Sequence, residues 1–330
     1  AGSAPDFIRI NSPGDLPLLG AESETRVNVS AAGDIINATG DDTAVNATAP
    51  VVELSSESGR IGGISRPVTV GPHQELKASS EDDLWLQASQ GDLTIDRITA
   101  RNGKVDLWAK EDIVECQPFE TEADVRGVSV DLKAKRGSIG MDTSEDYRDL
   151  DVVTHGGKVD ASARGGVYLN NPEETLSVGL VTSPARVNLA ANGSILDHDG
   201  GHGIDVHGGN GIALYSRNGT VGQGHSVDNH LNVSGPVGGV RAAGASVHVL
   251  PHRDETGRVP FAHHVHETVV QAGRRNTGAD GNRPNLVPLR RQLRRRRSEG
   301  GHISGNLIEI LPDALPLEPP GSGVEDGKNE

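Results

Sequence analysis

One segment of about twelve residues occurs three times along the chain at nearly constant spacing, the sign of a repeat architecture. It reads RVNVSAAGDIIN from Arg26, KVDLWAKEDIVE from Lys104 and RVNLAANGSILD from Arg186, so the offsets are 78 and 82 residues. A second segment follows at similar offsets as GRIGG from Gly59, GSIGM from Gly137 and GTVGQ from Gly219. Because the matched segments keep their order and spacing, the sequence predicts three copies of one structural unit.

Within each unit the apolar residues alternate with polar ones. Val105, Leu107 and Ala109 are separated by Asp106 and Trp108, and the other copies follow the same pattern. Alternation with a period of two places one face of a β-strand inward and the other in water. No segment sustains the spacing of an amphipathic helix, so the pattern predicts an all-β protein.

The composition favours a solenoid over a globular core. Only 2% of the residues are aromatic, whereas the chain contains 43 glycines. Small aliphatic side chains suit a narrow interior, and glycines suit sharp corners. We therefore expect a right-handed parallel β-helix of about twelve coils, four in each unit of about eighty residues, forming a rod of roughly 60 Å. A sandwich of antiparallel hairpins is the alternative.

The repeats also suggest boundaries. We expect an N-terminal lead-in (1–25), three solenoid units (26–103, 104–185 and 186–266, the last with a degenerate end) and an Arg-rich linker with a cap or irregular tail (267–330). Within that last segment, Leu307 to Leu311 reads as a short apolar strand.

The charge, the cysteine content and the apolar runs argue against nucleic-acid binding, an intrachain disulfide and a transmembrane segment. A net charge of −15 disfavours nucleic-acid phosphates, so no nucleic acid is expected. Cys116 is the only cysteine and excludes an intrachain disulfide. No run of eighteen apolar residues occurs, so no transmembrane segment is expected.

The sequence contains only weak indications of a metal site. Gly200 to Asp205 begins like the calcium-binding GGxGxD repeat, but the next stretch lacks the aspartate, so calcium is an unfavoured alternative. His263, His264 and His266 lie close together without a carboxylate or cysteine at a suitable spacing. We expect no metal and no other cofactor.

A basic run near the C-terminal end contrasts with the acidic body. It comprises Arg290, Arg291, Arg294, Arg295, Arg296 and Arg297. Such a run could bind a polyanion such as anionic lipid or a heparin-like glycan, or it could be a solvated linker.

An enzyme is the second functional hypothesis, because parallel β-helices also carry polysaccharide lyases and hydrolases. Glycoside cleavage needs two carboxylates at a fixed separation. Acids are abundant, including Asp83, Asp92, Asp96 and Asp112, but none stands out. Trp85 matches Tyr168 of the next unit, so an aromatic at this position is typical of the repeat. No catalytic residue is predicted.

The repeats resemble those of a known family. The runs GKVDLWAKEDIVE, ARVNLAANGSILD and VSVDLKAKRGSIG are similar to the repeats of filamentous-haemagglutinin-like large exoproteins, in particular the leukotoxin-type filamentous adhesins, over about residues 25–250. The resemblance implies a parallel β-helix that passes an outer-membrane transporter and is displayed on, or released from, a bacterial cell. It also implies host-cell or matrix glycans and proteins, or other cells, as partners.

Together these observations predict a non-enzymatic structural or adhesive segment of a large exported bacterial protein, extracellular or at the cell surface. A carbohydrate-active β-helix enzyme and a calcium-stabilised toxin-like repeat remain the alternatives.

Overall fold

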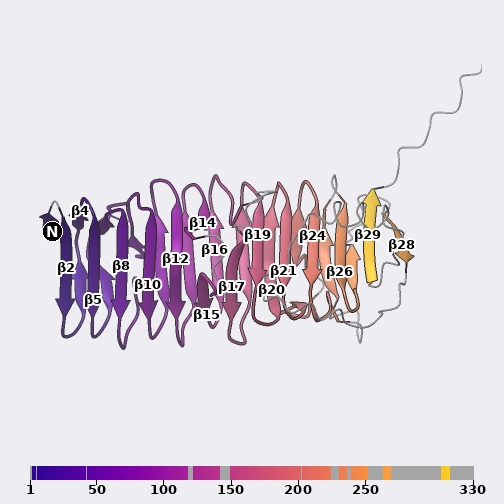
Figure 1. Cartoon of the computed structure of the whole chain (residues 1–330), viewed down its shortest axis with the longest axis horizontal. Coiled ribbons are helices and arrows are strands. Elements are labelled where there is room, and N and C mark those ends of the chain that lie inside the picture. Colours follow the sequence, from indigo (N-terminus) through magenta and orange to yellow (C-terminus); the bar gives the residue numbers. More distant parts are fainter. Residues whose placement is uncertain are drawn as a thin grey trace, which may run out of the picture.

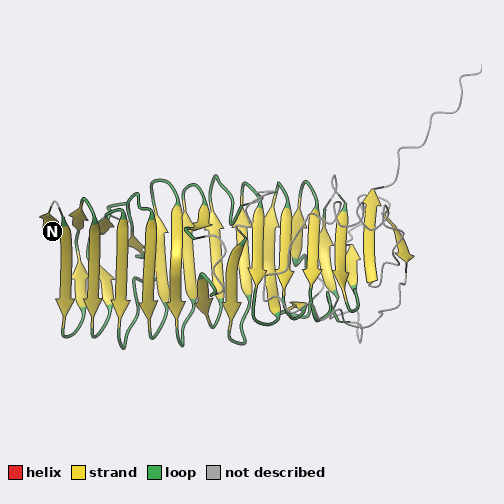
Figure 2. Cartoon of the chain, viewed as in Figure 1, coloured by secondary structure: helices red, strands yellow, loops and turns green. Residues whose placement is uncertain are grey.

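The computed structural model is an elongated rod of stacked β-strands (Figure 1). It describes the main chain of residues 2–4, 6–41, 43–117, 122–141, 149–201, 203–223, 230–235, 239–251, 263–268 and 306–312. Every regular element within these ranges is a strand, and none is a helix (Figure 2). The strands run parallel and stack coil upon coil, which confirms the expected all-β solenoid.

Two large sheets form opposite sides of the rod. The long sheet has 14 strands. In hydrogen-bonded order they are β2 (Phe7–Ser12), β5 (Arg26–Ala31), β8 (Val51–Ser56), β10 (Glu75–Ser80), β12 (Leu93–Ala100), β15 (Val125–Gly127), β17 (Leu150–Thr154), β19 (Val167–Asn171), β21 (Val187–Ala191), β24 (Ile212–Ser216), β26 (Val240–Gly244), β29 (Asn306–Pro312) and β28 (His263–Thr268), with β14 (Ile113–Glu115) beside β12.

The short sheet has ten strands. They are β27 (Val249–Pro251), β25 (Leu231–Ser234), β23 (Val206–Gly208), β20 (Leu176–Ser183), β18 (Val159–Ala163), β16 (Val130–Ala134), β13 (Val105–Ala109), β11 (Leu84–Ala88) and β9 (Val68–Thr69), with β22 (Ile195–Asp197) beside β20. Near the N-terminal end, two smaller sheets contain β1 (Gly2–Ala4), β4 (Ala21–Ser23) and β7 (Ala47–Thr48), and β3 (Leu16–Leu18) with β6 (Ile35–Asn37).

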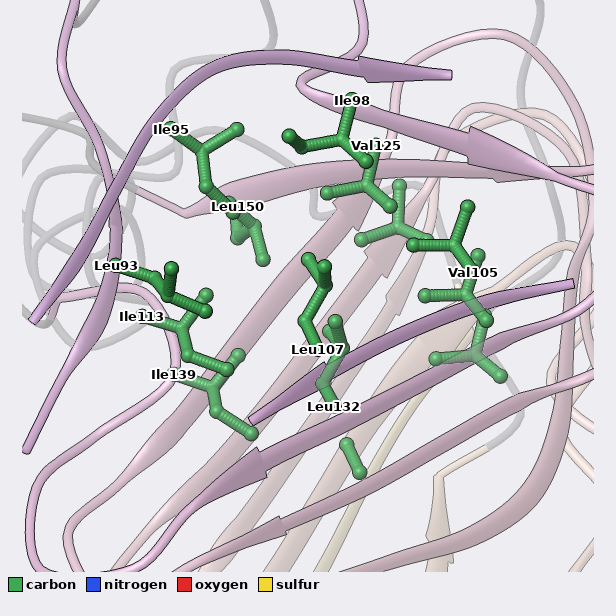
Figure 3. Packing of buried hydrophobic residues seen from close by; sticks show 14 of the residues in the cluster. Leu93, Ile95, Ile98, Val105, Leu107, Ile113, Val125, Leu132, Ile139 and Leu150 are labelled. Carbon is green, nitrogen blue, oxygen red and sulfur yellow. The ribbon is translucent and has the colours of Figure 1, made fainter. Parts of the chain in front are cut away.

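The core consists of aliphatic columns that run along the rod. In β13, Val105, Leu107 and Ala109 are buried while Asp106 and Trp108 lie on the outer face, as the alternation predicts. Figure 3 shows the inward side chains of the two sheets facing one another. Leu107 pairs with Leu132 of the next coil, so each coil covers the apolar face of its neighbour. Full burial of such a side chain contributes about 1.5–3 kcal/mol.

The repeat advances the chain by about three and a half coils, rather than the four that we expected. Val27, Val52, Leu76 and Ile95 occupy successive coils of the long sheet. Val105, which corresponds to Val27 in the next unit, then lies in the short sheet, half a coil further on. The described coils are consequently fewer than the expected twelve.

The second unit makes the same advance, this time from the short sheet to the long sheet. Val105, Val130, Val159 and Val178 are successive residues of the short sheet. Val187, the equivalent of Val105 in the third unit, returns to the long sheet. Equivalent features of successive units therefore face opposite sides of the rod.

The pairing changes direction only at the C-terminal end of the described strands. β29 pairs antiparallel with β26 and with β28, whereas every other described pair of strands is parallel. The strand expected at Leu307 to Leu311 is confirmed, because it lies within β29. Antiparallel hairpins do not build the body of the rod, so the sandwich alternative is wrong.

Candidate functional site

Buried polar side chains at equivalent positions of the three units connect successive coils, beside the short sheet in the first and third units and beside the long sheet in the second. Asn46 is fully buried, and its Oδ1 atom accepts the main-chain N–H of Thr69 at 2.8 Å. In the second unit Asp124 has the same position, and its Oδ2 atom accepts the N–H of Asp151 at 2.7 Å. A buried carboxylate or amide at this position satisfies a main-chain donor that the turn leaves without a strand partner.

Asp205, the aspartate of the calcium-like GGxGxD stretch, has the equivalent position in the third unit. It is 5% exposed, and its Oδ2 atom accepts the N–H of Asn232 at 2.6 Å. Burial, together with the charges of Asp197 and Asp199, raises the pKa of Asp205 to about 7. The main-chain contact accounts for Asp205 without an ion. Among the residues that the structure describes, no group of three or more His, Cys, Asp or Glu side chains could hold a metal ion.

Further acids have a similar structural task at the turns before strands of both sheets, with Asp83 before β11 of the short sheet and Asp92 before β12 of the long sheet. Asp83 Oδ1 accepts the N–H of Lys104 at 2.7 Å, and Asp92 Oδ1 accepts the N–H of Asp112 at 2.9 Å. Asp112 in turn accepts the N–H of Ser138 at 2.5 Å. These carboxylates, which were possible glycosidase acids, each hold the main chain of the following coil.

Asp96 lies in a third environment. Its Oδ2 atom is 3.1 Å from Lys77 Nζ, and its Oδ1 atom accepts a hydrogen bond from Gln117 Nε2 at 3.2 Å. The Sγ atom of Cys116 is 3.7 Å from the same oxygen. Asp96 therefore connects three coils through polar contacts, and the lone cysteine is part of that group.

The equivalent aromatic residues Trp85 and Tyr168 both lie beside a glycine of the preceding coil. Gly62 has φ of 74°, and a Cβ atom there would lie 2.5 Å from the Trp85 carbonyl oxygen. Gly140, with φ of 65°, stands in the same relation to Tyr168. The sequence predicted this equivalence, and the structure adds that the main-chain carbonyl of each aromatic residue lies against a glycine of the preceding coil.

The sequence alternation already placed Trp108 on the outer face of its strand, but it did not predict the neighbours of that side chain. Trp108 lies on β13 in the coil after Trp85, and the register pairs Trp85 with Asp106 and Gln87 with Trp108. The two indoles are thus diagonal neighbours on the outer face of the short sheet. Only the register of β11 against β13 places them together, and that register is not evident from a repeat alignment.

Charged and amide groups surround the two indoles. Lys104 Nζ lies 3.2 Å from Asp106 Oδ2 and 3.2 Å from Asp131 Oδ2. Burial and the neighbouring Asp131 raise the pKa of Asp106. Gln87 donates through Nε2 to Thr69 Oγ1 at 2.7 Å. The surface therefore combines two flat apolar rings with polar groups that neighbouring side chains hold in place.

The histidine and arginine candidates lie at the far end of the chain. His263, His264 and His266 belong to β28, whose main chain pairs antiparallel with β29. Arg290, Arg291, Arg294, Arg295, Arg296 and Arg297 lie outside the described residues. The polyanion-binding hypothesis for the arginines stays a prediction.

The comparisons with known proteins identify no relative. No family model, curated protein or solved structure matches the chain. Among the described residues, no helix has the length and apolarity needed to cross a membrane. The fold and the outward surfaces therefore provide the basis for a functional argument.

Proposed function

We propose that the chain is a non-enzymatic structural and adhesive segment of a large exported bacterial protein, located outside the cell or at its surface. The main support is the solenoid, which repeats one outward surface along a rod and, because of the half-coil advance, presents it alternately on both sides. A rod of this kind separates its ends and offers many contacts to host-cell or matrix glycans and proteins, or to other cells.

The conspicuous acids support a non-enzymatic role. Asp83, Asp112, Asp124 and Asp205 each accept a main-chain N–H from the next coil. A catalytic pair would instead leave two carboxylates facing a shared substrate site. The resemblance to filamentous-haemagglutinin-like repeats adds export through an outer-membrane transporter to the proposal.

An adhesion assay tests the proposal. Beads coated with the full chain should bind cultured epithelial cells or extracellular matrix more strongly than beads coated with albumin. The same protein incubated with a panel of polysaccharides should release neither reducing ends nor unsaturated uronates. Beads that bind no better than the albumin control would contradict the adhesive role, and release of sugar products would contradict the non-enzymatic one.

A further inference from the structure

The chain contains only two tryptophans, and both lie on one surface. Trp85 and Trp108 alternate with buried residues of β11 and β13, so both side chains are directed outward and are half-buried. One strand spacing and two residues along the strand separate them, which places their Cβ atoms about 8 Å apart. We call Trp85, Gln87, Asp106, Trp108 and Asp131 the tryptophan face.

The repeat does not require the second indole. An aromatic residue recurs at the position of Trp85, where Tyr168 is its equivalent, and the main-chain carbonyls of the two residues lie against Gly62 and Gly140. The positions that correspond to Trp108 in the other units, by offsets of 78 and 82 residues, are Ser30 and Ala190. Since those coils form with small residues, the folding of the solenoid does not explain Trp108. A large, partly exposed aromatic residue is instead typical of binding surfaces.

The polar part of the face has the groups that bind hydroxyls. Asp106 and Asp131 share the ammonium group of Lys104, with both distances at 3.2 Å. Their contacts fix two acceptor groups and one donor beside the indoles. Gln87 is oriented by its 2.7 Å bond to Thr69. Rigid polar groups next to an apolar plate cost little entropy to engage, which favours ligands with many hydroxyls.

The ligand class follows from the rings and the charge. One face of a pyranose carries C–H groups with slight positive charge, which pack against the negative face of an indole. The Cβ atoms of the two indoles are about 8 Å apart, so each indole can pack against a different ring of one oligosaccharide. On the face, Lys104 and Lys133, the latter paired with Trp108, balance the charges of Asp106 and Asp131, and the whole chain carries −15, so the surface favours a ligand without charge over a polyanion such as a glycosaminoglycan. We propose that the tryptophan face binds a neutral oligosaccharide, an inference that rests on the proposed adhesive function and names its ligand class.

The tryptophans also provide the assay. Because both tryptophans lie on the face, tryptophan fluorescence, excited selectively over that of the three tyrosines, reports on this surface alone. Cellohexaose and chitohexaose are the probes. We expect a saturable change in fluorescence in about the millimolar range, since an open face does not enclose the sugar. No saturable change with either hexasaccharide at up to about 10 mM would overturn the proposal.

Variants locate the binding. By calorimetry, Trp108→Ala should weaken binding at least tenfold, whereas Trp108→Phe should keep most of it because a flat ring remains. Tyr215→Ala is the matched control, since Tyr215 is an outward, half-buried aromatic residue on β24 of the long sheet. Unchanged affinity in Trp108→Ala, or equal loss in Tyr215→Ala, would overturn the assignment. Circular dichroism checks that each variant keeps its β signal.

A final comparison separates this inference from the proposed function. If wild-type beads adhere to cells and Trp108→Ala beads adhere less, both proposals are supported. If adhesion is unchanged in Trp108→Ala beads, the tryptophan face is not the adhesive surface, and the adhesive function stands. If wild-type chain binds the hexasaccharides but its beads do not adhere, the sugar site stands and the adhesive function fails.

Discussion

The side chain of Asp205 accepts the main-chain N–H of Asn232 in the next coil at 2.6 Å, although burial and nearby acids raise the pKa of its carboxyl to about 7. The first unit has an amide at this position. Asn46 makes the corresponding main-chain contact and also donates through Nδ2 to Asn37 Oδ1 at 3.0 Å. Asp197 corresponds to Asn37, so the third unit places two acids where the first has two amides.

Replacing Asp205 with asparagine should stabilise the protein at alkaline pH. Because the folded-state pKa lies above the unfolded value of 3.8, the contribution of Asp205 is complete below pH 3.8 and is lost as the pH rises through about 7. Asparagine keeps the acceptor and stays neutral. We expect Asp205→Asn to gain about 1–3 kcal/mol over wild type at pH 8 and much less at pH 5. Thermal unfolding at both pH values measures this; a larger gain at pH 5 would refute it.

His73 should make the first unit less stable in acid. Burial lowers its pKa below 6.5. Its Nδ1 atom lies 2.8 Å from Gly71 O and donates to it, while Nε2 accepts the N–H of Thr94 at 3.1 Å. Protonation would remove that acceptor. The contribution of His73 is complete above pH 6.5 and is lost as the pH falls from 6.5 through its lower folded-state pKa.

The glutamine variant tests this pH effect, because an amide can keep both contacts without titrating. His73→Gln should flatten the fall in melting temperature between pH 6.5 and 5, where one proton changes stability by up to about 1.4 kcal/mol per pH unit. An imidazole that titrates at or above pH 6.5 by NMR in the folded protein would contradict the prediction. Asp205 has the opposite pH dependence, so the comparison is made against wild type at each pH.

Gly62 should tolerate no side chain, whereas its neighbour should. Gly62 has φ of 74°, and a Cβ atom would lie 2.5 Å from Trp85 O and 2.9 Å from Val68 N. Gly63 has nothing within 4 Å of its Cβ position. We expect Gly62→Ala to cost about 1–3 kcal/mol and Gly63→Ala less than about 0.5 kcal/mol in urea unfolding. Equal stabilities of the two variants would contradict this explanation of the glycine.

The sequence predicted the strands and their inward residues because burial on one side imposes a period of two, as in Val105 and Leu107. It did not predict the half-coil advance, because the coils differ in length. The step from Val167 to Val187 takes 20 residues, and the step from Val187 to Ile212 takes 25. Loops at the corners absorb the difference, and an average spacing conceals it.

The candidate surface was predictable only in part. The repeat alignment identified Trp85 and its equivalent Tyr168. The proximity of Trp108 to Trp85 depends on which coil stacks on which, and hydrogen-bond register decides that. The structural role of Asp205 likewise depends on the position of Asn232, which lies 27 residues further along the chain.

The aliphatic column makes the core sensitive to cavities at any coil. Leu107 is fully buried between Leu86 and Leu132 of the adjacent coils, whereas Leu180 is 48% exposed. Leu107→Ala removes packing from both neighbours and should cost about 2–5 kcal/mol, while Leu180→Ala should cost less than about 1 kcal/mol. Hydrogen exchange should show the loss of protection centred on β11, β13 and β16, because a solenoid coil contacts only its neighbours. Protection lost evenly along the rod would mean that the coils unfold as one cooperative body, and the nearest-neighbour description of the column would be wrong.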